Sequence, residues 1–499
     1  MKKNILIIIA GIMVFMSSCS KDFLNVNEKN PNLASQVDPK LVLPAAQNAI
    51  AYTMNNPRRF EFVYLWHGLW SISAGYSQPM ALTQYRLLNS SYQNAWLEFY
   101  LAGSNLTAIE QASTTPQTVY YLAIAKIMKA YIFQNIVDCW GDAPYTEAYQ
   151  TGSGNLKPKY DKQKAIYEDL IVQLDAAMNL IQTATISASI PTATNDIVYH
   201  GNMGLWLKFA NTLKLRILLH QAAMDGREAY IKGAIATTAS IGYLGAGESA
   251  LSNPPYIVSA GKMNPFYETY YNNAGGAQSD GITYHNAGKD NVDFLIASND
   301  PRIGKYWQPY SGTSYDGNYL GALVLTPANK TSKLGYIKDD VGTMIGTPTK
   351  AAPILTDFES LFIQAEAAQR GLISGDVQAL YEGAVKRSFA YCGVPAASAA
   401  VFLSQNTDKT NFSVAVDKLK LIILQKWVAL NGVAPVEIWD DYRRTGIPSF
   451  IHFSQDPAKA KEYPPVRLLI PQDEVDVNNE NVVAVGTIDP WTSKIFWQK

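Results

Sequence analysis

Cys19 is the residue of this chain whose surroundings point most directly to a chemical modification. It ends the stretch GIMVFMSSC, where an apolar run gives way to a polar sequence. Lys2 and Lys3 precede that run, and Met16 and two serines follow it. An apolar run of about a dozen residues is too short for a membrane span, which takes ~20 helical residues, but it suits a signal peptide. The residues before Cys19 match a bacterial lipobox, with Met16 at a position where Leu or Val is commoner.

A lipobox predicts a defined series of reactions at Cys19. The thiol receives a diacylglyceryl group, a peptidase cuts the chain before it, and Cys19 becomes the acylated first residue. We therefore expect residues 1–18 to be a lipoprotein signal peptide, and the mature protein to be held at a membrane by lipid alone. The alternative is an ordinary signal peptide followed by a chance cysteine.

Motifs for catalysis or metal binding are scarce in the remaining sequence. The five histidines form no metal-spaced pair, and neither a Gly-x-Ser-x-Gly elbow nor a Gly-x-x-x-x-Gly-Lys loop occurs. Asp440 and Asp441 suggest a glycosidase, but its two carboxyls must flank a sugar at ~5 Å or ~6.5–9.5 Å, which adjacency in sequence does not provide. We expect these aspartates to form salt bridges with Arg443 and Arg444 near a helix end. The sequence thus predicts a protein that is not an enzyme, with no cofactor and no metal site.

Composition narrows the remaining classes of function. The 41 basic and 42 acidic residues nearly cancel, which argues against nucleic acid as a partner. There are 30 tyrosines and 10 tryptophans against 17 phenylalanines, an excess of rings with a polar group that suits wet surfaces. Besides Cys19 the chain has only Cys139 and Cys392, for which we favour two buried thiols over one disulfide.

Helices should form most of the scaffold that positions these residues. Apolar residues recur at helical spacing in several segments, some joined by tight glycine turns. This pattern favours a mainly α fold of tetratricopeptide-like hairpins, although no clean repeat length can be counted. Residues 242–353 are instead rich in Gly, Asn, Ser, Tyr and Pro, so we expect a loop-rich region with short strands, within a single domain of residues 19–499. The predicted helices are Asp38–Met54, Thr118–Asp138, Tyr160–Gln182, Gly201–Gln221, Asp357–Arg370, Asp376–Tyr391 and Val416–Asn431.

Several short motifs, in a fixed order along the chain, resemble the SusD/RagB family of outer-membrane nutrient-binding lipoproteins, and its SusD-like subgroup in particular. The resemblance extends over residues 19–499. One stretch departs from it, QKWVALNG at Gln425–Gly432, where the family usually has a charged Glu-Arg-Arg-x-x-Glu segment. The matching stretches are CSKDFLNVNEKNPN from Cys19, WGDAPYTEAY at Trp140–Tyr149, NDPRI at Asn299–Ile303, DFESLFIQAEAAQRG at Asp357–Gly371, VEIWDDYRRTGIP at Val436–Pro448 and the tail VRLLIPQDEVDVNNENV.

The resemblance implies a fold, a location and a partner. The fold is four tetratricopeptide-like hairpins packed against a loop-rich remainder. The location is the surface of the outer membrane, and the partner is a TonB-dependent, SusC-like transporter over which the lipoprotein sits as a hinged lid. Ligands in the family are mostly glycans, so we expect capture of oligosaccharides and their delivery to the transporter. The alternatives are a peptide-binding member, a glycoside hydrolase and a purely structural tetratricopeptide adaptor.

A glycan site should combine aromatic rings with polar side chains. A sugar ring has an apolar face of C–H bonds, on which aromatics stack, and a rim of hydroxyls. Two segments hold this mixture, in the broad regions where the family places its binding face; the competing interpretation is that most of these rings are packing anchors. Trp70, Trp307 and Tyr315 are preferred because their Gly, Ser or Pro neighbours indicate loops. The predicted ligand-binding residues are Trp70, Tyr76, Gln78, Tyr85 and Arg86 in the first segment, and Tyr270, Asn272, Trp307, Tyr310 and Tyr315 in the second.

Overall fold

The computed structural model describes residues 38–185, 192, 194–273, 276 and 281–499. The predicted signal peptide and Cys19 lie outside these residues. Residues Pro39–Lys499 form one compact unit, to which the following description refers. None of the helices in the described ranges combines the length and the hydrophobicity that a membrane span needs.

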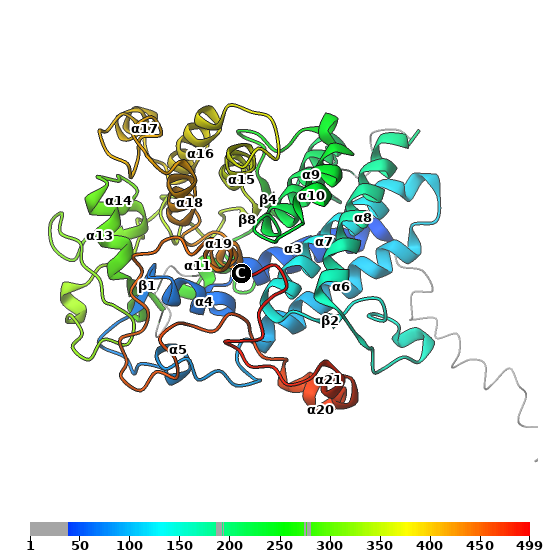
Figure 1. Cartoon of the computed structure of the whole chain (residues 1–499), viewed down its shortest axis with the longest axis horizontal. Helices are drawn as coiled ribbons and strands as arrows, with labels where there is room; N and C mark the ends of the chain where they lie inside the picture. Colours follow the sequence, from blue (N-terminus) through cyan, green and yellow to red (C-terminus); the bar gives the residue numbers. More distant parts are fainter. Residues whose placement is uncertain (1–37, 186–191, 193, 274–275, 277–280) are drawn as a thin grey trace, which may run out of the picture. The chain divides into compact units, whose positions relative to one another are not determined.

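Five helices from the first half of the chain pack as successive neighbours (Figure 1). They are α3 (Pro39–Asn55), α6 (Gln93–Ala112), α7 (Val119–Trp140), α8 (Gln163–Thr183) and α9 (Met203–His220). Each helix after α3 packs against the one before it. Helix α7 is buried along most of its length, as its nearly uniform apolar sequence predicts, and it ends where Gly141 adopts a φ of 77°.

A second group of helices follows the loop-rich region, and α15 connects the two groups. Helix α15 contacts both α9 and α16, and it also packs on α18. Side-chain caps set the starts of these helices: Thr356, Asp376 and Asp417 each accept a hydrogen bond from a backbone N–H of the first turn. The group comprises α15 (Asp357–Gln369), α16 (Val377–Tyr391), α17 (Ala396–Leu403), α18 (Lys418–Ala429) and α19 (Pro435–Thr445).

All the helices predicted from sequence are present within a few residues of their expected ends. The mainly α class and the paired-helix architecture are therefore confirmed. The prediction missed α6, whose buried face includes Trp96, Phe99, Leu106 and Ile109, and it gave no bounds for α19. The remaining α-helices described outside the loop-rich region are α4 (Pro57–Trp66), α5 (Met80–Thr83), α10 (Glu228–Ala236), α20 (Gln472–Val477) and α21 (Asn479–Val485).

The loop-rich region contains short strands, as predicted, and also four short helices that were not predicted. A four-stranded antiparallel sheet has the order β1-β5-β7-β6, and two small strand pairs join β2 to β3 and β4 to β8. The strands are β1 (Trp70–Ile72), β2 (Ala143–Pro144), β3 (Tyr160–Asp161), β4 (Ala250–Ser252), β5 (His285–Ala287), β6 (Trp307–Gln308), β7 (Lys333–Leu334) and β8 (Ala352–Leu355), and the helices are α11 (Pro265–Tyr270), α12 (Gly281–Tyr284), α13 (Lys289–Ala297) and α14 (Ile303–Tyr306).

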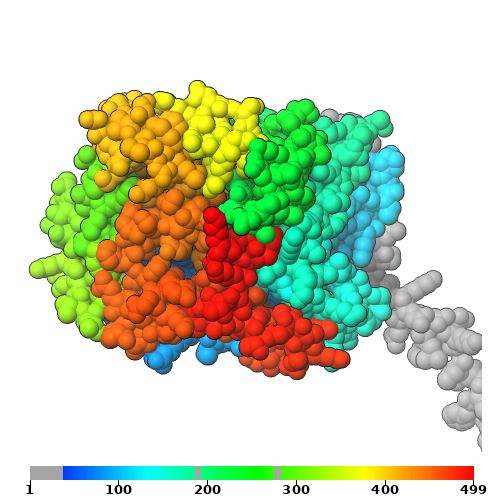
Figure 2. Space-filling model, in the orientation of Figure 1, coloured from blue at the N-terminus to red at the C-terminus, as the bar shows by residue number. Residues whose placement is uncertain are grey.

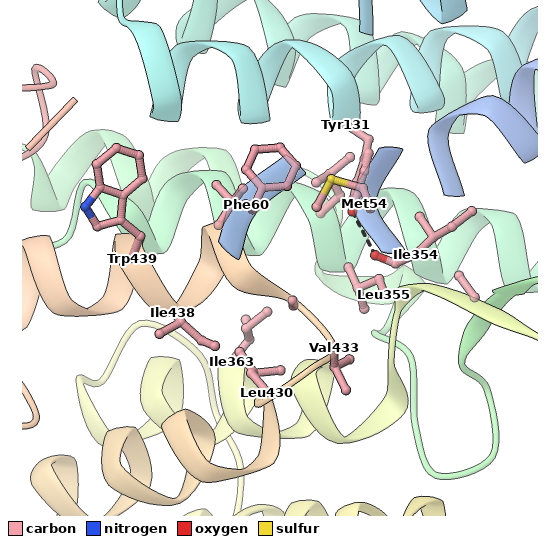
Figure 3. Packing of buried hydrophobic residues seen from close by; sticks show 14 of the residues in the cluster. Met54, Phe60, Tyr131, Ile354, Leu355, Ile363, Leu430, Val433, Ile438 and Trp439 are labelled. Carbon is pink, nitrogen blue, oxygen red and sulfur yellow. Dashed lines mark hydrogen bonds between the residues drawn. The ribbon is translucent and has the colours of Figure 1, made fainter. Parts of the chain in front are cut away.

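One hydrophobic core joins the two helix groups to the strands (Figure 3). Met54 and Phe60 come from α3 and α4, while Ile363 and Trp439 come from α15 and α19. Tyr131 of α7 contributes its ring to this core and donates its hydroxyl to the carbonyl oxygen of Ile354 on β8, at 2.9 Å. This bond satisfies a polar group that would otherwise be costly to bury.

Cys139 and Cys392 are both buried and unbridged. Burial raises the pKa of each thiol, because a thiolate is poorly solvated in an apolar interior. The prediction of two buried thiols is confirmed.

Candidate functional site

The four-stranded sheet brings together the two segments from which a glycan site was predicted. Trp70 lies opposite Ala287, and Trp307 lies opposite Leu334, so residues far apart in sequence share one small sheet. The residue after β5, Gly288, closely approaches the segment before β1: a Cβ added there would lie 2.3 Å from the carbonyl oxygen of Gly68, which only glycine avoids. The two predicted segments therefore lie close together, but several of their aromatic rings point into the hydrophobic core.

Trp70 and Trp307 are core residues, and the prediction that they lie on exposed loops was wrong. Their side chains are 1% and 0% exposed. The indole N–H of Trp70 donates to Oδ1 of Asn431 at 2.8 Å, and that of Trp307 donates to Oδ1 of Asn291 at 2.9 Å. The ring of Trp70 also stacks on Tyr64 at 4.3 Å. The neighbouring glycines and serines belong to tight strand ends rather than to exposed loops, and no face of either indole is left for a ligand.

Tyr85 and Tyr270 are also fully buried, which corrects their assignment to a binding surface. The hydroxyl oxygen of Tyr85 accepts a hydrogen bond from the backbone N–H of Ser454 at 2.7 Å. The hydroxyl of Tyr270 lies 2.9 Å from Nδ1 of His285. Both phenols serve as hydrogen-bonded packing anchors.

The other predicted residues remain at or near the surface. Tyr76 is half-buried, and its hydroxyl lies 2.5 Å from Oγ1 of Thr283, so the first and second segments touch here. Arg86 is exposed, and the side chain of Tyr310 is 39% exposed. Gln78, Asn272 and Tyr315 are half-buried. None of the predicted residues lines the large groove described next.

A groove of about 530 Å³ opens between α13, α18 and the loops around residues 408–417 and 450–452. This volume lies in the range of ~300–1,000 Å³ that is typical of small-molecule sites. We refer to it as the groove. Its lining is Asp290, Asp293, Phe294, Ala297, Tyr319, Asp408, Lys409, Ala415, Val416, Asp417, Lys420, Leu421, Leu424, Phe450 and His452.

One side of the groove offers apolar surface. Phe450 stacks on Phe294 with ring centroids 5.5 Å apart and planes 10° from parallel, and it meets Trp427 edge-on at 5.9 Å. Its side chain is nevertheless 38% exposed. A ring held from behind by two others, with part of its surface open, is a pre-formed platform for an apolar ligand face.

Polar groups surround this platform in a fixed arrangement. His452 lies against the ring of Tyr319 at 4.6 Å, and its Nδ1 lies 2.7 Å from Oδ1 of Asp290. The backbone N–H of His452 donates to the other carboxylate oxygen at 2.9 Å. Burial raises the pKa of Asp290, although the bonds from His452 oppose that shift. His452 is thereby oriented at the groove while remaining largely open to solvent.

The groove also carries charges that can bind hydroxyls or charged groups. Asp408, Asp417 and Lys420 are exposed, and Asp293 is exposed while paired with Lys289 at 2.9 Å. The residues predicted from sequence did not include Phe450 or His452. The stretch SFIHF places three apolar residues after the end of a helix at Gly446, and this was the signal that could have found them.

The aspartates of the motif EIWDDYRR lie elsewhere, in a buried ion network. Asp440 pairs with Arg443 at 2.5 Å and Asp441 with Arg444 at 2.5 Å, which confirms the predicted salt bridges. Both aspartates are almost fully buried. Since their charges are used within the core, they give no support to a glycosidase pair.

The network also contains a group of possible metal ligands, which the spacing of the histidines in the sequence could not reveal. Single ligand atoms from Asp138, His220 and Asp440 all lie within 4.8 Å of one another. Tyr167 and Trp497 already donate to Asp138, whereas Oδ2 of Asp440 has no hydrogen-bond partner among the described residues. Burial raises the pKa of both Asp138 and Asp440, which favours a proton held by this pair of carboxyls.

Comparison with known proteins places this architecture in one family. Residues 31–471 match the SusD-like family described as starch-binding and associating with the outer membrane. A chitin-binding protein of known structure is 22% identical, with a TM-score of 0.73 over 93% of this chain and 100% of that one. A chitin-binding SusD homologue from Flavobacterium johnsoniae is 23% identical, with a TM-score of 0.72 over 91% of this chain and 98% of that one. A SusD homologue from Bacteroides uniformis is 22% identical, with a TM-score of 0.71 over 92% and 99%.

No curated protein matches the chain. At these identities the structural likeness establishes the fold, and the family match establishes membership. The motifs WGDAPYTEAY and VEIWDDYRRTGIP, together with the paired helices and the loop-rich region, agree with that match. The chain therefore belongs to the SusD-like family of glycan-binding proteins that associate with the outer membrane.

Proposed function

We propose that this protein is a cell-surface lipoprotein that captures oligosaccharides in the groove and delivers them to a TonB-dependent outer-membrane transporter. The observation that carries the proposal is the groove itself, in which Phe450 and Tyr319 stand beside hydrogen-bonding groups from Asp290, His452 and Lys420. A sugar ring can stack on Phe450 while its hydroxyls bond to the surrounding polar side chains. Glycan binding by the family and the chitin-binding descriptions of two structural relatives support this choice of ligand.

The platform predicts which substitutions should weaken glycan binding. Tyr319→Ala and Phe450→Ala should each weaken binding about tenfold, because a well-placed aromatic contact contributes about 1–2 kcal/mol. Isothermal titration with chitin and malto-oligosaccharides measures this directly. Tyr310→Ala is the matched control, since its ring is exposed but lies outside the groove. Unchanged affinity in both groove variants, with a measurable affinity in the parent protein, would remove the groove as the site.

A peptide ligand is the second candidate, because six charged side chains line the groove: Asp290, Asp293, Asp408, Asp417, Lys409 and Lys420. A neutral glycan does not need them, whereas the termini and side chains of a peptide do. The same titrations should therefore include a mixture of short peptides at low and high salt. Salt-sensitive peptide binding in the absence of glycan binding would select this alternative.

A further inference from the structure

A second pocket, of about 350 Å³, lies on a different part of the body from the groove. Its walls come from the end of α4, from α19, from the segment 463–466 and from the C-terminal residues 491–498. Figure 2 shows a hollow on this face between the orange atoms and the red atoms of the C-terminal segment. The two cavities share no lining residue. We refer to this second cavity as the C-terminal pocket.

Unsatisfied polar atoms are concentrated in its lining. Among the described residues, four side chains of this pocket each keep one buried polar atom without a hydrogen-bond partner. Two are donors, Nε of Arg443 and Nε1 of Trp491, and two are acceptors, Nε2 of His67 and Oε1 of Gln498. Buried polar groups are normally paired, so several unpaired ones around one cavity indicate a missing partner.

His67 is an acceptor because its tautomer is fixed. Its Nδ1 lies 2.8 Å from the carbonyl oxygen of Val63, and a carbonyl requires a donor. Burial lowers the pKa of His67 to about 4, so the ring is neutral near pH 7. Its Nε2 therefore presents a lone pair and can accept a hydrogen bond from a hydroxyl.

Arg443 supplies a fixed positive charge in the lining of the pocket. Its Nη1 donates to the backbone oxygens of Asp138 and Val466 at 2.8 and 2.7 Å, and its Nη2 donates to Asp440 at 2.5 Å. The guanidinium also lies over the ring of Trp439 at 3.9 Å. These contacts use every nitrogen except Nε. Among the residues that the structure describes, the lining contains a second cation, Lys494, and no acidic side chain, which favours an anionic ligand.

The remaining walls suit a sugar ring. Tyr442 and Trp491 are half-buried, and the side chain of Tyr463 is 45% exposed. Pro464 and Pro465 follow Tyr463 and stiffen that wall, since proline restricts the backbone. Partly open rings beside both donors and acceptors are the surroundings in which C–H faces and hydroxyls bind together.

We propose that the C-terminal pocket binds an acidic saccharide, with the carboxylate of a uronic acid held by Arg443 and Trp491. The hydroxyls of the same sugar would then donate to His67 and Gln498, and its C–H face would pack against Tyr463. A carboxylate can accept hydrogen bonds from both unpaired N–H groups at once, close to the second cation, Lys494, whereas a simple carboxylic acid leaves the two acceptors unpaired. The assignment extends beyond the proposed capture of glycans in the groove, because it concerns a separate site and a charged ligand.

Titration of the purified protein with digalacturonate tests this assignment. Galactobiose is the neutral control ligand, and acetate is the control for a carboxylate alone. Digalacturonate should bind at least tenfold more tightly than either control, and its affinity should fall with added salt. Trp491→Phe removes the N–H and keeps an aromatic ring, and it should weaken binding of digalacturonate about tenfold, since a hydrogen bond to a charged group is worth about 1.5–3 kcal/mol.

A second variant separates this site from the groove. Tyr463→Ala alters only an exposed wall and should also weaken digalacturonate binding, whereas Phe450→Ala in the groove should leave it unchanged. Equal affinity for digalacturonate and galactobiose would overturn the acidic class of ligand. The C-terminal pocket would be excluded as the site if Phe450→Ala lost digalacturonate binding while Trp491→Phe and Tyr463→Ala kept it. The absence of any saturable binding would exclude it as well. A negative result here would not contradict glycan binding in the groove. Titration with neutral oligosaccharides tests that function separately.

Discussion

At the scale of single residues, two buried tryptophans connect the four-stranded sheet to elements outside it. Trp70 of β1 donates to Asn431, a residue 361 positions further along the chain and just beyond α18. Trp307 of β6 makes the equivalent bond to Asn291 of α13, the helix that forms one wall of the groove. These indoles therefore do not contact a ligand in the groove, but they help to fix the positions of the elements around it.

Trp70→Ala should destabilise the protein strongly. Loss of a fully buried indole leaves a cavity, and such changes cost about 3–5 kcal/mol. Urea denaturation should show this as a lower transition midpoint. The exposed Tyr310 provides the control, because Tyr310→Ala should change stability by no more than about 0.5 kcal/mol. A Trp70→Ala protein of parental stability that has lost only its affinity for glycans would reinstate Trp70 as a ligand residue.

The sequence predicted which two segments hold the mixture of aromatic and polar residues, but not which of their rings face outward. Gly and Ser beside Trp70 are compatible with a loop and also with the tight end of a short strand, and only the partner atom distinguishes the two. That partner, Asn431, is too distant in the chain to be recognised from local pattern. For Phe450 and His452 the stretch SFIHF gave a local signal, but their place in the groove depends on α13 and α18, which are distant in the chain.

At the scale of elements, a buried ion pair ties α15 to α19. Both guanidinium Nη atoms of Arg444 donate to the carboxylate of Glu366, and Arg444 also binds Asp441 on its own helix. Burial alone would raise the pKa of Glu366, but Arg444 outweighs it and holds that pKa at about 2. The stabilisation is therefore complete above the ordinary pKa of glutamate, ~4.3, and is lost as the pH falls toward 2.

Glu366→Gln should change both the stability and its dependence on pH. At pH 7 the variant should lose about 3–5 kcal/mol, because Arg444 keeps a buried charge with one partner fewer. Between pH 4.5 and 2 the unfolding free energy of the variant should fall less steeply than that of the parent. Chemical denaturation across this pH range measures both effects. Parallel curves for the two proteins would show that Glu366 does not titrate in that interval.

Helices were predictable here, whereas the sheet was not. Segments such as Gln163–Thr183 carry a continuous apolar stripe whose period is local to the chain. The sheet β1-β5-β7-β6 is built from strands of two or three residues, which are too short to show an alternating pattern. Their pairing depends on long-range packing and on the close approach of the chain at Gly288, neither of which is visible in a short window of sequence.

At the scale of the whole molecule, the proposed attachment rests on Cys19, outside the described residues. Cys19→Ala should leave the signal peptide uncut by the lipoprotein peptidase and the chain without lipid. Metabolic labelling with a palmitate analogue should mark the parent protein and not the variant. Cys139→Ala is the control, because that thiol is buried and its loss should not change labelling. Equal labelling of parent and Cys19→Ala would remove the lipid anchor.

The burial of Cys139 and Cys392 has a practical consequence for labelling the protein. Because neither sulfur is accessible or readily ionised, alkylating reagents should not modify Cys139 or Cys392 in the folded protein. A cysteine introduced on the surface should therefore be labelled without competition from these two thiols. A fluorophore could then be placed beside the groove or beside the C-terminal pocket without first removing the natural sulfhydryls. The unaltered protein is thus already a suitable background for following each cavity separately by site-directed dyes in living cells.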